Sequence, residues 1–122
     1  MKKKKILIVE GEKTVALQLR AILNALGYSV CCEVSSGKQA IASIRKNIPD
    51  CILMDVSLKG EMSGIEAATE IMDRFDIPVI FLAAPSDSKL LEQAKYAGTY
   101  GYILKPFDES VSHASGNGHN AL

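Results

Sequence analysis

Residues 49–55 read PDCILMD, and this stretch decides the fold class of the chain. The apolar run from Cys51 to Met54 predicts a strand buried on both faces, because a half-exposed strand would alternate apolar and polar residues. Pro49 marks the turn before that strand. Asp55 places a carboxylate directly at its carboxyl end.

Outward from this segment, short apolar runs alternate with stretches in which apolar residues recur at helical spacing. We expect strands at 5–10, 29–34, 51–55, 78–82 and 100–104. Helices are expected at 15–26, 36–46, 64–75 and 87–97, the second capped by Ser36. Buried strands that alternate with helices predict an α/β fold, a doubly wound parallel sheet with helices on both faces.

The C-terminal stretch 110–122, SVSHASGNGHNAL, differs from the rest. A fifth helix belongs there in the βα repeat, but Gly116, Asn117, Gly118 and Asn120 are poor helix formers. We therefore expect one domain over residues 1–122, with 109–122 forming a weak, degraded or frayed fifth helix.

Composition excludes several classes of protein. The 122 residues carry 14 basic and 14 acidic side chains, and this zero net charge argues against a nucleic-acid-binding module. The three cysteines, Cys31, Cys32 and Cys51, lack disulfide or metal-site spacing and are expected to be buried free thiols. No apolar run approaches the length of a membrane span and no signal peptide is visible, so we expect a cytoplasmic domain.

Polar residues at the ends of the expected strands are the candidate site, because ligands of open parallel sheets bind beyond the carboxyl ends of the strands. These positions are Glu10, Gly11, Glu12, Asp55, Ala83, Ala84 and Lys105. A carboxylate can accept a phosphoryl group as an acyl phosphate, with a lysine and Mg²⁺ balancing the charge. The residues alone leave a second reading open, in which Asp55 is a hydrogen-bonded cap on the following loop.

Five segments resemble the receiver domains of two-component response regulators, in the right order along residues 4 to 108. They are ILIVE at 6–10, PDCILMD at 49–55, MSGIE at 62–66, IPVI at 77–80 and GYILKPF at 101–107. The resemblance implies a flavodoxin-like sheet of five strands in the order 2-1-3-4-5. It also implies a signalling domain rather than an enzyme.

The resemblance assigns roles residue by residue. Asp55 resembles the phosphoacceptor and Lys105 the lysine that contacts the phosphoryl group. Glu10 resembles the first acid of a pair that holds Mg²⁺, together with Asp55 and the backbone carbonyl of Ser57. Tyr102 stands at the position of a switch aromatic.

Two positions depart from the family pattern. Gly11 stands where the second acid binds the metal directly, so Mg²⁺ binding is expected to be weak or absent. Ala83 stands where a switch hydroxyl binds the phosphoryl group. Glu10, one carbon longer than aspartate, is a candidate to reach the metal itself, and Glu12 is expected to point elsewhere. Pro106 follows the family's cis peptide bond.

Three hypotheses follow. In the first, a histidine kinase or phosphotransfer protein phosphorylates Asp55, and the chain signals through the face of helix 4, strand 5 and helix 5, to an output domain or as a homodimer. In the second, the chain is a degenerate receiver that binds proteins without phosphorylation. The third, a doubly wound ligand-binding domain, requires a glycine-rich loop after the first strand, and residues 10–13, EGEK, do not supply one. No nucleic-acid or membrane partner is expected for this domain.

Overall fold

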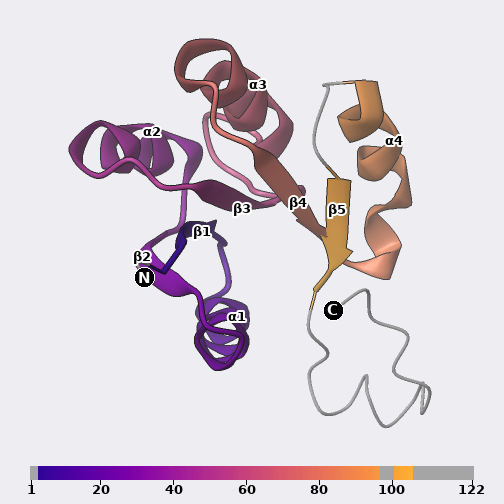
Figure 1. The fold of residues 1–122 in the computed structure, drawn as a ribbon. Coiled ribbons are helices and arrows are strands. Elements are labelled where there is room, and N and C mark those ends of the chain that lie inside the picture. Colours follow the sequence, from indigo (N-terminus) through magenta and orange to yellow (C-terminus); the bar gives the residue numbers. More distant parts are fainter. Residues whose placement is uncertain (1–2, 97–100, 106–122) are drawn as a thin grey trace, which may run out of the picture.

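The computed structural model describes residues 3–96 and 101–105, which form a parallel sheet covered by helices (Figure 1). The strands are β1 (Lys5–Val9), β2 (Ser29–Val34), β3 (Cys51–Asp55), β4 (Val79–Ala83) and β5 (Gly101–Leu104). The helices are α1 (Lys13–Ala25), α2 (Gly37–Lys46), α3 (Gly64–Phe75) and α4 (Ser88–Tyr96), the last preceded by a 3₁₀ turn at Pro85–Asp87. The strand order is β2-β1-β3-β4-β5, and every neighbouring pair is parallel. The predicted flavodoxin-like fold is confirmed.

Most predicted boundaries agree with the structure, and the differences have a simple cause. Helix α1 begins at Lys13 rather than at Val15, because its first turn is polar and apolar spacing cannot mark it. Strand β1 ends at Val9, not at residue 10, and β4 runs one residue later than predicted. Helix α2 is capped as predicted, since the Ser36 hydroxyl accepts a hydrogen bond from the Gln39 backbone N–H.

The two faces of the sheet are covered by different helices (Figure 1). On one face, α1 packs on what we call the α1-side cluster, which consists of Ile6, Ile8, Ala16, Leu19, Leu23, Leu53 and Leu82. On the other face, helices α2, α3 and α4 pack on the α2-side cluster, which includes Leu7, Ile44, Ile52, Ile71, Phe81 and Ala83. Strand β3 supplies residues to both clusters, as its uninterrupted apolar run predicts.

The loop after β3 is fixed by the start of α3. The Ser63 hydroxyl accepts from the Glu66 backbone N–H, while the Glu66 carboxylate accepts from the Ser63 N–H. A Cβ atom at Gly64 would lie 2.2 Å from the backbone carbonyl oxygen of Asp55. Glycine at this position therefore allows α3 to begin directly against the end of β3.

The thiols of Cys31, Cys32 and Cys51 are free, as predicted, but each is only partly buried. The prediction of buried thiols was wrong because Cys31 and Cys32 lie on β2, an edge strand. Burial nevertheless raises the pKa of both Cys31 and Cys51.

The expected fifth helix at 109–122 and the peptide bond before Pro106 lie outside the described residues. Within residues 3–96 and 101–105, none of the helices has the length and apolar character needed to cross a membrane.

Candidate functional site

Three charged side chains meet at the carboxyl edge of the sheet. Glu10 directly follows β1, Asp55 ends β3 and Lys105 directly follows β5. The backbone N–H of Lys105 donates to the carbonyl of Ala83 at 2.8 Å, so the main chain of β4 holds the lysine in place. The parallel order of the strands thus brings together residues that lie up to 95 positions apart in the sequence.

The distances show one cation serving two acids. The Lys105 Nζ lies 3.1 Å from Asp55 Oδ1 and 3.6 Å from Glu10 Oε1. Glu10 is 3% exposed and Asp55 is 4% exposed, so these charges interact through protein rather than through bulk water. Buried acids are rare unless they are paired or functional.

Burial decides the protonation of Glu10. The pKa of the Glu10 carboxyl is raised to about 7, mainly by loss of solvent and also by the nearby Asp55. The Glu12 backbone N–H and the Lys105 ammonium act in the opposite direction and lower it. Burial of the Lys105 ammonium acts to lower its pKa, but the charges of Asp55 and Glu10 outweigh this and raise it. Near neutral pH the cluster can therefore approach charge balance with the lysine protonated.

Ser57 contributes more than was predicted. Its backbone N–H donates to Asp55 Oδ1 at 2.9 Å, and its hydroxyl reaches the same oxygen at 2.8 Å. The family resemblance implies only a carbonyl ligand at Ser57 and gives no role to its side chain. The backbone contact has a sequence signal, because an aspartate side chain commonly accepts a hydrogen bond from the backbone N–H two residues on.

The donor set fits a hard cation, with one carboxylate fewer than the family pattern implies. Glu10 Oε1 is buried and has no hydrogen-bond partner among the described residues. Gly11 offers no ligand, and Glu12 is exposed while its N–H donates to Glu10 Oε2 at 3.0 Å. The described residues contain no group of three or more histidine, cysteine or acidic side chains arranged for a metal. Glu10, Asp55 and the Ser57 carbonyl are the groups that could hold Mg²⁺.

The two positions predicted to act as a switch lie on adjacent strands. Ala83 is fully buried at the end of β4 and faces the α2-side cluster. Tyr102 lies on β5 opposite Phe81 and is 49% exposed. Ser86 and Ser88, past Pro85, are exposed, so neither brings a buried hydroxyl to the position of Ala83.

Sequence comparisons identify relatives of this chain. The family model for the response regulator receiver domain matches residues 6–115. The chain is 34% identical over 107 residues to the transcriptional regulatory protein PdtaR of Mycobacterium tuberculosis, covering 88% of this chain and 52% of PdtaR. It is 32% identical to the chemotaxis protein CheY of Thermotoga maritima, covering 88% of this chain and 89% of CheY. The chain spans about half the length of several curated relatives, including PdtaR.

Solved structures agree with the sequence comparisons. The signal receiver domain of a modulated diguanylate cyclase from Desulfovibrio desulfuricans superimposes with a TM-score of 0.79 at 31% identity, covering 93% of this chain and 90% of that one. The N-terminal domain of a response regulator/sensory box/GGDEF protein from Carboxydothermus hydrogenoformans gives 0.75 at 36% identity, covering 91% and 89%. The fold, the cluster of Glu10, Asp55 and Lys105, and these matches lead to one conclusion: the chain belongs to the response regulator receiver domain family.

Proposed function

We propose that Asp55 accepts a phosphoryl group from a histidine kinase or a phosphotransfer protein. The observation that carries this proposal is the buried contact of 3.1 Å between Lys105 Nζ and Asp55 Oδ1 at the carboxyl edge of the sheet. An ion pair that served stability alone would gain little from such burial, since desolvation offsets much of the attraction. Pairing at a ligand-binding edge favours a chemical role.

The chain's own residues supply nucleophile, charge and orientation. An Asp55 oxygen attacks the phosphorus, the new O–P bond forms, and the bond to the donor breaks with its electron pair leaving on the donor. Lys105 supplies positive charge to the phosphoryl oxygens. The N–H and hydroxyl of Ser57 hold Asp55 Oδ1, which leaves the other carboxylate oxygen for the attack. Bound Mg²⁺ would neutralise further negative charge at the phosphoryl group.

The position of Lys105 connects the phosphorylation site to β4 and β5, and this connection provides a route for signalling. The backbone of Lys105 is hydrogen-bonded to β4 and continues from β5, the strand that carries Tyr102. Under this proposal, phosphorylation changes the face formed by α4 and β5, which an output domain or a second copy of the chain then contacts. The domain acts in the cytoplasm as a signalling element and not as an enzyme.

A second candidate function is favoured by two specific positions. Gly11 removes a metal carboxylate, and Ala83 removes a hydroxyl at a fully buried position. A receiver with these two losses would bind its partner protein in one fixed state, without phosphate input. The two candidates make opposite predictions for chemistry at Asp55.

Intact-mass spectrometry with a small phosphodonor separates the two candidates. The chain is incubated with acetyl phosphate and Mg²⁺, and an Asp55→Asn variant serves as the matched control. A mass increase of one phosphoryl group in the wild-type chain alone supports the first candidate. An unmodified wild-type chain, under conditions in which a known receiver domain is modified, supports the second.

A further inference from the structure

Strand β2 contains an irregularity at its two neighbouring cysteines. In a regular strand, adjacent side chains point to opposite faces of the sheet. The pairing of β1 with β2 shifts at this point, since Ile6 pairs with Val30 whereas Leu7 pairs with Cys32. Cys31 is therefore the extra residue of a bulge, and a bulge re-aims the side chains beside it.

The bulge brings both thiols to one face. Cys31 and Cys32 both pack against the α2-side cluster, whereas Val30 packs against the α1-side cluster on the opposite face. Cys32 lies close enough to act on the Cys31 thiol: burial raises the pKa of Cys31, and the neighbouring Cys32 raises it further. Two adjacent thiols thus share one environment, which a regular strand would not allow.

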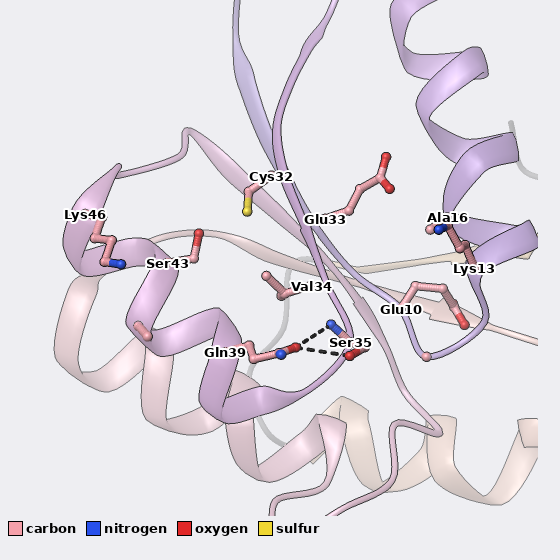
Figure 2. Close-up of a pocket in the computed structure, with 12 residues that line it drawn as sticks. Glu10, Lys13, Ala16, Cys32, Glu33, Val34, Ser35, Gln39, Ser43 and Lys46 are labelled. Atoms are coloured by element: carbon pink, nitrogen blue, oxygen red, sulfur yellow. Dashed lines mark hydrogen bonds between the residues drawn. The ribbon is translucent and has the colours of Figure 1, made fainter.

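The site is open to small molecules. Both cysteines are free and only partly buried. Cys32 lines a groove of about 630 Å³, with Gln39, Ser43 and Lys46 of α2 on one wall (Figure 2). The groove gives a compact reagent a route to the face on which both thiols lie.

The third cysteine lies elsewhere. Cys51 of β3 is paired with Ile6 and packs against the α1-side cluster. It is on the opposite face of the sheet from Cys31 and Cys32, so it cannot complete a three-thiol site with them. The pair of thiols therefore suits a ligand whose central atom forms two bonds to sulfur and already carries a third substituent of its own.

We propose that Cys31 and Cys32 form a dithiol site for trivalent arsenic compounds of the form R–As(OH)₂. Each thiol replaces one hydroxyl group, so two As–O bonds break, two As–S bonds form and two water molecules leave with the thiol protons. Arsenic remains trivalent, and no oxidant or reductant is needed.

The probe is phenylarsine oxide, added in equimolar amount to the full reduced chain. The expected product is one adduct per chain, with the number of titratable thiols falling from three to one. Cys31→Ser and Cys32→Ser should each weaken binding by about 100-fold, because each removes the second, intramolecular contact. Cys51→Ser is the matched control and should bind like the wild-type chain. Unchanged affinity in Cys31→Ser, or loss of the adduct in Cys51→Ser, would overturn the proposal.

A thermal melt tests whether the folded bulge forms the site. A ligand that binds the native state in preference to the unfolded chain raises the melting temperature. We expect equimolar phenylarsine oxide to raise the melting temperature of the wild-type chain and to leave that of Cys32→Ser unchanged. A melting temperature that stays unchanged or falls with the arsenical would show that it does not bind the folded chain in preference to the unfolded one, and the proposal would fail.

Discussion

The ammonium group of Lys105 contacts Asp55 Oδ1 at 3.1 Å and lies 3.6 Å from Glu10 Oε1. This single cation therefore separates two carboxylates that are both buried at the edge of the sheet. The geometry that we propose for phosphoryl transfer also makes the resting domain sensitive to charge. Stability measurements can consequently test the arrangement of the site independently of phosphorylation.

Replacing Lys105 should destabilise the domain. Lys105→Met removes the cation and leaves the Glu10 and Asp55 carboxylates buried without it, at a cost of about 3 kcal/mol in the free energy of unfolding near neutral pH. The loss should shrink in acid as the carboxyls take up protons. It should also shrink in strong base, because the raised pKa of Lys105 means that its contribution is lost as pH rises through that value.

Urea unfolding across pH measures this effect, with Lys89→Met, at an exposed position, as the control. A pH profile of Lys105→Met that runs parallel to that of the wild-type chain would remove Lys105 from the charge cluster.

Glu10 should make the wild-type chain less stable as pH rises through the neutral range. Its pKa is raised from 4.5 to about 7, so between these values the folded state binds more protons than the unfolded state. Glu10→Gln cannot titrate. Its stability relative to wild type should therefore grow by roughly 3 kcal/mol between about pH 4.5 and pH 8. Unfolding curves in metal-free buffer check this, and a constant difference between the two chains would contradict it.

Gly11 should limit the affinity for Mg²⁺. A side chain fits at this position, because a Cβ atom on Gly11 would meet nothing within 4 Å. Gly11→Asp restores a carboxylate and should strengthen Mg²⁺ binding by about 10- to 100-fold, measured by isothermal titration calorimetry. Gly11→Asn has nearly the same shape without the charge and should show little gain. Equal affinity in wild type and Gly11→Asp would mean that Glu10 or Glu12 already supplies the missing ligand.

Ala83 should weaken the response of β5 to phosphorylation. A hydroxyl bonded to a charged group contributes about 1.5 to 3 kcal/mol, so its absence removes a bias of about 10- to 150-fold toward the active state. Amide NMR shifts on adding beryllofluoride should therefore be smaller at Tyr102 and α4 in wild type than in Ala83→Thr. Ala83→Val matches threonine in shape without the hydroxyl and should behave like wild type. Shifts of equal size in wild type and Ala83→Thr would show that the hydroxyl is dispensable.

The sheet could be predicted from sequence because its strands are buried. The uninterrupted apolar runs of β1 and β3 identify these strands without any knowledge of long-range contacts. The capping residues Ser36 and Ser63 lie at the starts of α2 and α3. The start of α1 could not be predicted, since Glu12 makes no side-chain cap and Lys13 is polar. Strand order came from the family resemblance and not from local pattern.

The site could be predicted only in part. Asp55, Lys105 and Glu10 were identified by motif, but the burial of Glu10 and its raised pKa depend on three strands meeting in space. The hydroxyl bond of Ser57 depends on a side-chain rotamer, which sequence does not specify. The bulge at Cys31 depends on the pairing of β2 with β1, and no glycine or proline marks it.

Under the proposed function, Asp55 becomes an acyl phosphate. Its most direct test is borohydride trapping: the chain is treated with acetyl phosphate and Mg²⁺, then reduced with sodium borohydride, which converts an aspartyl phosphate to homoserine. Peptide mass spectrometry then locates the homoserine. We expect homoserine at position 55, and none in Asp55→Asn or when acetyl phosphate is omitted. Trapping at another carboxylate, or no homoserine in a chain that binds Mg²⁺, would contradict it.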